Sequence, residues 1–157
     1  MDERWRANRR YYSNGYKILN MVIYEQKVYW GEMDAFNHVN NTIYFRYFEN
    51  ARLLYFEESG ILEMMQKSQT GPIMAQADCQ FIKAVKYPDY IKVKAFVSIV
   101  KNTSFKMEYE LFSTKQNCIA AKGSSVIVMI DYKTGKKASI PKSILESIDR
   151  LDNPTYE

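Results

Sequence analysis

The feature that most constrains the fold of this chain is one long aromatic segment, residues 41–60, with the sequence NTIYFRYFENARLLYFEESG. Five of its side chains share the i, i+3, i+4, i+7, i+11 spacing of one helical face: Tyr44, Tyr47, Phe48, Ala51 and Tyr55. Further apolar side chains lie around the rest of the circumference. We therefore expect a helix from Thr42 to Ser59 that other elements cover on most sides. Asn41 is a suitable N-cap, and Gly60 suits the C-terminal stop.

The chain after this segment changes to the two-residue repeat of β-strands. Four consecutive stretches show the repeat: residues 73–81, 91–99, 105–111 and 118–131. Short turn-forming links separate them, which predicts hairpins and an antiparallel sheet.

Two shorter segments complete the pattern. Residues 22–31 are typical of another strand, and residues 140–151 of a short helix with Pro141 at its first position. The order of elements predicts an α+β fold in which a sheet of about five strands covers one long helix.

A length of 157 residues fits one domain, and we expect it to span residues 21–150. Residues 1–20 form a basic N-terminal arm with four arginines, which we expect to be solvated. No stretch is apolar enough for a signal peptide or a membrane span. A net charge of +4 is too small for the electrostatic footprint of a nucleic-acid-binding protein.

Metal and redox chemistry are poorly supported by the sequence. Cys79 and Cys118 lie in strand-like segments, which predicts two buried free thiols. One histidine and two distant cysteines do not supply zinc ligands at standard spacing. No glycine-rich loop suited to phosphates is present. We expect no metal, no bound cofactor and a reducing, cytoplasmic setting.

The element order and residues 29–52, YWGEMDAFNHVNNTIYFRYFENAR, resemble the hot-dog fold thioesterases of the 4-hydroxybenzoyl-CoA thioesterase type. Residues 80–89 and 126–145 extend the resemblance, although Ala84 stands where the family pattern has a proline. The whole resemblance extends from about Lys27 to Leu145. The resemblance implies a curved antiparallel sheet around a long helix. It also implies a homodimer at least, with active sites assembled between two subunits, and is compatible with a homotetramer.

The resemblance places the catalytic carboxylate of the family at Asp34, seven residues before Asn41. Thioester hydrolysis needs a carboxylate that attacks the carbonyl carbon or activates a water, and donors for the developing oxyanion. The helix N-terminus at Asn41 offers free N–H groups and about half a positive charge. We expect Asp34 to act as nucleophile or general base there. By residue type alone, an Asp just before a helix is more typical of a turn or a cap.

Other polar residues are expected to support this acid or the substrate. His38 can orient Asp34 or the substrate, or bond locally within its loop. Asn40 is expected to shape the loop. By resemblance, Thr103 and Ser104 start a strand where the family often places a small polar residue near the active site.

Two glutamates are the competing acids. Glu32 is expected to be structural or solvent-facing. Glu49 matches in type the helix-borne catalytic glutamate of a related hot-dog branch. Its i, i+3 spacing to Arg52 predicts an ion pair instead.

The expected function is that of an acyl-CoA thioesterase whose substrate is its main partner. Several lysines are candidates for contacting the phosphates of coenzyme A: Lys83, Lys86, Lys92, Lys94 and Lys101. Two alternatives remain open from the sequence. One is a thioesterase acting on acyl carrier protein, for which the basic arm would be the docking element. The other is a hot-dog module that binds acyl groups without turnover.

Overall fold

The computed structural model describes residues 21–157, so the predicted basic arm, residues 1–20, lies outside the described residues. Residues 21–157 form six strands, three α-helices and one 3₁₀ helix. In order these are β1 (Val22–Lys27), η2 (Trp30–Glu32), α1 (Asn41–Glu58), α2 (Ile61–Lys67), β2 (Thr70–Phe81), β3 (Tyr90–Val100), β4 (Ser104–Ser113), β5 (Cys118–Asp131), α3 (Lys142–Asp152) and β6 (Thr155–Tyr156).

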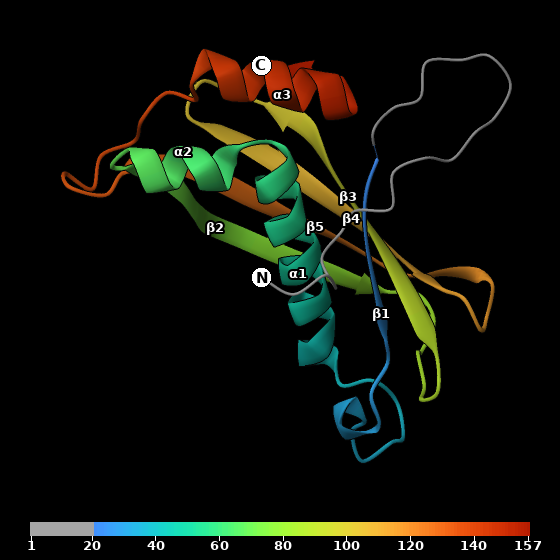
Figure 1. The fold of residues 1–157 in the computed structure, drawn as a ribbon. Coiled ribbons are helices and arrows are strands. Elements are labelled where there is room, and N and C mark those ends of the chain that lie inside the picture. The colour runs from blue at the N-terminus through green and yellow to red at the C-terminus, as the bar shows by residue number, and fades with distance from the viewer. Residues whose placement is uncertain (1–20) are drawn as a thin grey trace, which may run out of the picture.

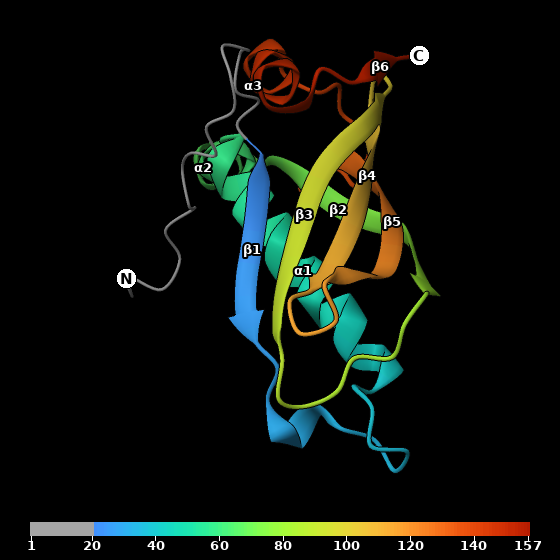
Figure 2. The same cartoon turned by 90° about the vertical axis from the view of Figure 1, so that its right-hand side faces the viewer.

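One sheet carries the fold, and α1 lies across it (Figures 1 and 2). The five long strands pair in the order β1-β3-β4-β5-β2, and every one of these pairings is antiparallel. The two-residue strand β6 adds to β3 in parallel. The predicted α+β architecture, a sheet of about five strands around one long helix, is confirmed.

The predicted hairpin between the strands now called β2 and β3 is wrong. β2 pairs along its length with β5, at the opposite edge of the sheet from β1. The reason is that β3 already has a partner on each side, β1 and β4, so only the outer side of β5 is free. The chain between β2 and β3 therefore crosses the end of the sheet instead of turning back on itself.

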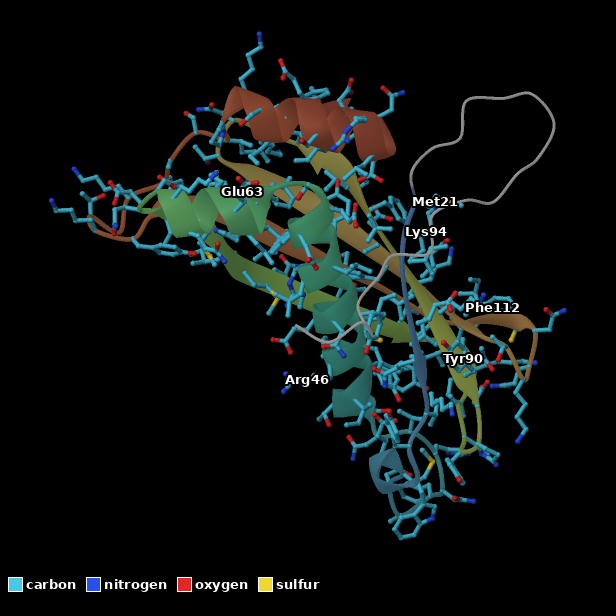
Figure 3. The ribbon with its side chains drawn as sticks, in the orientation of Figure 1. Met21, Arg46, Glu63, Tyr90, Lys94 and Phe112 are labelled. Atoms are coloured by element: carbon cyan, nitrogen blue, oxygen red, sulfur yellow. The ribbon has the colours of Figure 1, made fainter. Side chains whose placement is uncertain are left out.

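Burial alternates along the central strands, as the two-residue repeat predicts. Val93 and Ala95 of β3 and Met107 and Tyr109 of β4 are buried toward α1. The intervening residues are half-buried on the face away from the helix, where Figure 3 labels Lys94 and Phe112.

The predicted aromatic face of α1 is buried, and all five of its residues belong to the core: Tyr44, Tyr47, Phe48, Ala51 and Tyr55. The predicted cover on most sides is incomplete within one chain. Phe45 is 40% exposed and Leu53 is 46% exposed on another face of the same helix. Gly60 follows the helix in the left-handed conformation, with φ 80°, as its predicted stop role requires.

Three smaller expectations are revised or limited by the structure. Pro141 is the N-cap of α3 and not its first helical residue. Cys79 and Cys118 are free thiols but half-buried, because Cys79 lies on the edge strand β2 and Cys118 at the start of β5. Within residues 21–157 no helix is long and apolar enough to cross a membrane.

A buried hydrogen-bond cluster attaches α3 to α1 and β3. The Tyr55 hydroxyl, fully buried, donates to Asp152 Oδ2 at 2.5 Å, and the Val97 N–H donates to the same oxygen at 2.8 Å. Val97 lies where the β3–β4 register shifts. Burial raises the pKa of Asp152 above its usual value, although both hydrogen bonds act in the opposite direction.

We expect Asp152→Ala to lower the free energy of unfolding by about 1–3 kcal/mol, because the Val97 N–H and Tyr55 hydroxyl lose their acceptor. Asp152→Asn keeps an acceptor oxygen and avoids burying a charge. Since folding raises the Asp152 pKa, the stability this group contributes is full below its unfolded value of about 3.9 and is lost as pH rises through the folded value.

Urea unfolding of wild type and Asp152→Asn at several pH values, from about 4 to about 7, measures this effect, because that range begins at the ordinary carboxyl pKa and extends above it. The variant should gain stability relative to wild type as pH rises. A stability difference independent of pH would show that Asp152 does not titrate with a raised pKa.

Candidate active site

The loop between η2 and α1 is a tight hairpin that fixes Asp34. Met33 and Val39 form an isolated antiparallel bridge, and the Asp34 N–H donates to the His38 carbonyl at 2.7 Å. The tip closes through Asn37, which takes the left-handed conformation with φ 61° and donates its N–H to the Asp34 carbonyl at 3.0 Å. Asparagine tolerates this conformation better than most residues, which explains its place at the tip.

The Asp34 carboxylate has one engaged oxygen and one available oxygen. Oδ1 accepts the N–H groups of Phe36 at 2.8 Å and His38 at 3.2 Å. Oδ2 receives no hydrogen bond from any residue between 21 and 157. The half-buried carboxylate lies near the first turn of α1, because its charge contributes to the raised pKa of Tyr44, of which burial is the main cause. Asp34 is thus a turn residue that keeps one oxygen free.

The N-terminus of α1 lies directly after this hairpin. Asn40 is the N-cap, which corrects the prediction of Asn41: its Oδ1 accepts the Thr42 N–H at 3.0 Å and the Thr42 hydroxyl at 2.9 Å. The Asn40 carbonyl accepts the Ile43 N–H at 2.9 Å. In the described part of the chain no group accepts the N–H of Asn41, and this residue is exposed. The Asn41 N–H is therefore available to a ligand.

Glu32 connects η2 to α1 through its side chain and its backbone carbonyl. Its Oε2 accepts the hydroxyl of the fully buried Tyr47 at 2.6 Å and the Tyr29 N–H at 2.8 Å. Burial, and then the bond to Glu32, raise the pKa of the Tyr47 phenol. The Glu32 carbonyl also accepts the Asn40 N–H at 2.9 Å. The structural role predicted for Glu32 is confirmed.

The chain between β2 and β3 packs against the same hairpin. The Val39 N–H donates to the Val85 carbonyl at 2.9 Å, and the Val85 N–H donates to the Tyr44 hydroxyl at 3.3 Å. Val85 is fully buried, whereas Lys83 and Lys86 on either side of it are exposed. Two cations consequently lie near the Asp34 hairpin. Of the other candidate lysines, Lys92 pairs with Glu25 and Lys101 with Glu157.

One chain does not bring all the predicted site residues together. Thr103 and Ser104 lie at the start of β4, where the neighbouring Phe105 packs edge-on against Phe56 with ring centroids 6.4 Å apart. Phe56 is near the C-terminus of α1, more than 20 Å along the helix axis from Asn41 at about 1.5 Å per residue. Thr103 contributes its carbonyl to the Met129 N–H.

His38 contributes only backbone atoms to the hairpin. Its N–H donates to Asp34 Oδ1 and its carbonyl accepts the Asp34 N–H. Its ring makes no hydrogen bond to any residue that the structure describes. The His38 imidazole is therefore close to Asp34 in the sequence, but it does not orient the Asp34 carboxylate through a hydrogen bond.

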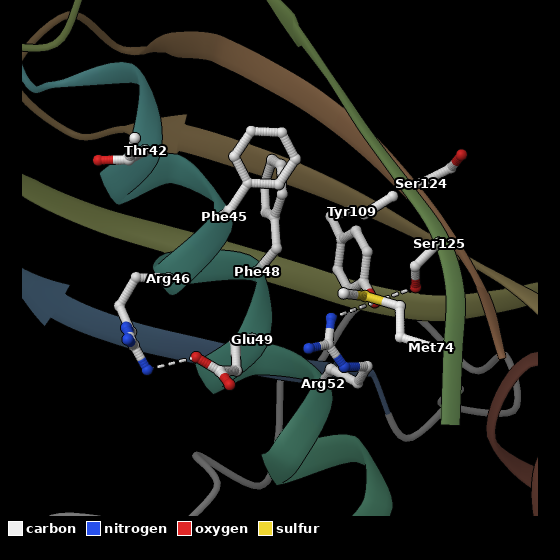
Figure 4. Close-up of a pocket in the computed structure, with 11 residues that line it drawn as sticks. Thr42, Phe45, Arg46, Phe48, Glu49, Arg52, Met74, Tyr109, Ser124 and Ser125 are labelled. Carbon is white, nitrogen blue, oxygen red and sulfur yellow. Dashed lines mark hydrogen bonds and ion pairs between the residues drawn. The ribbon is translucent and has the colours of Figure 1, made fainter. Parts of the chain in front are cut away.

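A pocket of about 210 Å³ opens between α1 and strands β2, β4 and β5 (Figure 4). It begins at Thr42, the residue after the free Asn41 N–H, and follows one face of α1 toward the middle of the helix. The residues that line it are Thr42, Phe45, Arg46, Phe48, Glu49, Arg52, Met74, Ala77, Tyr109, Ser124 and Ser125.

The floor of the pocket is a buried pair of hydroxyls. Tyr109 and Ser125 are each 1% exposed, and their oxygens lie 2.6 Å apart. Arg52 Nη1 donates to the Tyr109 hydroxyl at 3.4 Å. The Phe48 ring stacks on Tyr109 with centroids 4.9 Å apart. Gly123 permits this stacking, because a Cβ at that position would lie 2.4 Å from the Phe48 ring.

The predicted ion pair between Glu49 and Arg52 is wrong. Glu49 Oε2 instead pairs with Arg46 Nη1 at 2.5 Å, which is also an i, i+3 spacing (Figure 4). Arg52 therefore has no carboxylate within 4 Å among residues 21–157. The reason is that Arg52 lies toward the sheet and contacts Tyr109, while Arg46 is on the outer side of the helix, where its side chain is 68% exposed.

The sequence interpretation missed Arg52, Tyr109 and Ser125 as pocket residues. A signal for the helical part was present, because Thr42, Phe45, Glu49 and Arg52 follow a 3-4-3 spacing. Nothing local marks Tyr109 or Ser125, since both belong to the buried face of their strands. Among the described residues, no three His, Cys, Asp or Glu side chains converge as metal ligands.

Comparisons with known proteins show the family of this chain. The family model described as "Thioesterase-like superfamily" matches residues 28–148. A protein of Aquifex aeolicus (strain VF5) named "Putative esterase" is 31% identical over 125 residues, which cover 79% of this chain and 94% of that protein.

Solved structures with the same fold include proteins of Pseudomonas aeruginosa and Thermus thermophilus. The PA2801 protein of Pseudomonas aeruginosa is 28% identical, with a TM-score of 0.73 over 82% of this chain and 98% of the other. A thioesterase of Thermus thermophilus, solved with coenzyme A and Zn, is 24% identical, with a TM-score of 0.73 over 84% and 94% of the two chains. At 24% identity, the likeness to the Thermus thermophilus structure is evidence for a shared fold alone.

The capping role of Asn40 predicts a specific pattern of stabilities. Asn40→Ala should lower the free energy of unfolding by about 1 kcal/mol, because the Thr42 N–H loses its acceptor. Asn40→Asp keeps the acceptor oxygen and places a negative charge at the helix N-terminus, so it should be at least as stable as wild type. Urea unfolding at neutral pH measures both variants. An alanine variant as stable as wild type would contradict the role.

Proposed function

The chain belongs to the thioesterase-like superfamily, and we propose that it hydrolyses acyl-CoA thioesters to a free acid and coenzyme A. The observation that carries this proposal is the arrangement of Asp34 and Asn41. A half-buried carboxylate with one free oxygen lies in a rigid hairpin next to a helix whose first N–H has no acceptor in the described chain. A pocket that begins one residue further, at Thr42, can receive the acyl group.

The proposed reaction replaces the carbon–sulfur bond of the thioester by a carbon–oxygen bond, through a tetrahedral intermediate. The thioester carbonyl oxygen accepts the Asn41 N–H, where the helix places about half a positive charge. Asp34 Oδ2 either attacks the carbonyl carbon or takes a proton from an attacking water. The tetrahedral intermediate then expels coenzyme A as the carbon–sulfur bond breaks. The thiolate takes up a proton and the acid is released, after hydrolysis of the acyl-enzyme in the first case.

The two ends of an acyl-CoA suit the two sides of this site. The pocket between α1 and β2 suits the acyl group because aromatic and methionine side chains form much of its wall. Lys83 and Lys86 are exposed beside the Asp34 hairpin and suit the phosphates of coenzyme A. The coenzyme A bound by the Thermus thermophilus thioesterase of the same fold supports this choice of leaving group.

The proposed active form is a homodimer that joins through β2. This twelve-residue strand is the edge of the sheet, and no described residue pairs with its outer side. Ile73 is 42% exposed, Met74 52% and Phe81 46%, and Met74 lines the pocket together with the exposed Phe45 of α1. A long edge strand with exposed apolar side chains is rarely left open to water. A second copy on this edge would stand beside the pocket, since Met74 and Ala77 line it.

A charge on the edge strand should separate the subunits. Ile73→Asp places a carboxylate in the proposed interface, so the mass in solution should fall from at least twice 18.5 kDa to 18.5 kDa. Light scattering after size exclusion measures it. Tyr156→Asp, on β6 at the opposite edge, is the matched control and should leave the mass unchanged. A wild-type monomer would refute the proposed dimer.

Release of free thiol from short, long and aromatic acyl-CoA esters tests the function. We expect hydrolysis by wild type and a loss of about 100-fold or more in kcat for Asp34→Asn and Asp34→Ala, because neither variant can attack or deprotonate water. Circular dichroism confirms that the variants fold. Asn41→Ala is the matched control: it retains the backbone N–H, so its kcat should stay within about tenfold of wild type.

Three other outcomes have distinct meanings. Hydrolysis that does not depend on Asp34 would refute its role and direct attention to Glu49. Hydrolysis only of esters of acyl carrier protein would identify a protein-bound substrate. Binding of acyl groups without thiol release from any ester would identify a non-catalytic module.

A further inference from the structure

Arg52 has no carboxylate partner among residues 21–157, and its side chain lines the pocket. Its one protein hydrogen bond within residues 21–157 goes to the neutral Tyr109 hydroxyl, at a long 3.4 Å. A guanidinium has five N–H donors, so four remain for water or a ligand. Figure 4 shows its head group between α1 and the strands, on the pocket side of the helix. Arg52 itself is half-buried, which strengthens its attraction for an anion relative to a solvated side chain.

The hydroxyl pair on the pocket floor can supply one further donor, from Ser125. Tyr109 accepts from Arg52 and its oxygen lies 2.6 Å from Ser125 Oγ. Only one of the two hydroxyl protons lies between these oxygens. Either Tyr109 donates to Ser125, which leaves the Ser125 proton for a ligand, or Ser125 donates to Tyr109 and Tyr109 donates to Met107 Sδ at 3.8 Å. The inner end of the pocket thus offers several donors and few acceptors.

The charges around the pocket leave a net positive inner end. Three charged side chains line it, namely Arg46, Glu49 and Arg52. Arg46 and Glu49 neutralise each other in their ion pair at the rim. Arg52 remains, and the burial of Tyr109 and Ser125 beside it limits access of water. An acyl group that ends in a methyl would leave these donors without an acceptor at this place.

The distance from the reacting carbonyl to Arg52 fits a medium-length chain. Asn41 and Arg52 are separated by about 16 Å along the helix axis at about 1.5 Å per residue. Helical side chains lean toward the N-terminus, which shortens the span to the guanidinium to about 10 Å. This span suits a chain of about six to eight carbons.

We propose that the substrates are thioesters of dicarboxylic acids of about six to eight carbons, whose free carboxylate binds Arg52 and the Ser125 hydroxyl. This inference rests on the proposed function, because it names the acyl group for the same site. Recognition is by charge-assisted hydrogen bonds from the guanidinium, which carboxylates accept in a paired geometry. Arg52 is then a specificity-determining residue, distant from the bond that breaks.

A matched pair of esters tests the inference: suberyl-CoA, with a free carboxylate, and octanoyl-CoA, with a methyl in its place. Wild type should prefer suberyl-CoA in kcat/KM by about tenfold or more. Arg52→Met, similar in length and uncharged, should reduce the ratio of the two kcat/KM values by about 10- to 100-fold. Arg52→Lys should retain part of the preference. Arg150→Met, on the exposed side of α3, is the matched control and should leave the ratio unchanged.

A binding measurement separates this inference from the proposed function. Free suberate should bind wild type more tightly than octanoate in calorimetry, and Arg52→Met should abolish the difference. Suberate binding that depends on Arg52, without hydrolysis of any ester, would refute the hydrolase and keep the ligand class. Hydrolysis by wild type with no preference for suberyl-CoA would refute the dicarboxylic ligand class and keep the hydrolase. If Arg52→Met does not fold, Arg52→Lys and Ser125→Ala give the same ratio test, and an unchanged ratio in both overturns the inference.

Discussion

Three buried tyrosine hydroxyls on one face of α1 hold the helix in place, and the geometry of the site depends on them. The Tyr44 hydroxyl accepts the Val85 N–H, the Tyr47 hydroxyl donates to Glu32, and the Tyr55 hydroxyl donates to Asp152. A buried phenol requires a polar partner, because leaving it unpaired costs most of its desolvation energy. Each hydroxyl therefore joins α1 to a different segment: the chain after β2, η2 and α3.

These three attachments fix the rotation of α1 about its axis and thereby the composition of the pocket. With the tyrosine face turned to the core, the adjacent face that carries Arg52 must lie toward the sheet. Phe48 completes the arrangement by stacking on Tyr109, an approach that Gly123 permits. The same rotation leaves Phe45 and Leu53 exposed, and Phe45 lies by the pocket that β2 lines at the unpaired edge of the sheet. The pocket and the proposed interface are thus two consequences of one packed helix face.

The sequence predicted the elements well and their long-range partners less well. Periodicity identified α1 and the four long strands, because that signal depends on which side chains are buried. The partner of β2 depends on which sheet edges remain free, and local spacing does not encode this. Asn40 and Asn41 are equally good caps by residue type, so the boundary was misplaced by one residue. Likewise, Glu49 has an arginine at i−3 and another at i+3, and the sequence does not show which of them forms the ion pair. Arg52 contacts Tyr109 instead, so Glu49 pairs with Arg46.

The sequence also presented Asp34 as either a turn residue or a catalytic acid, and its two oxygens make these roles compatible. Oδ1 accepts two N–H groups of its own hairpin, which fixes the carboxylate plane. Oδ2 accepts no hydrogen bond from residues 21–157, and under the proposed function it is the oxygen that attacks the carbonyl carbon or activates a water. A nucleophile or base held in this way loses little freedom on reaching the transition state, which is the usual advantage of a preorganised site. The turn at Asp34 would therefore be the means by which the acid is positioned.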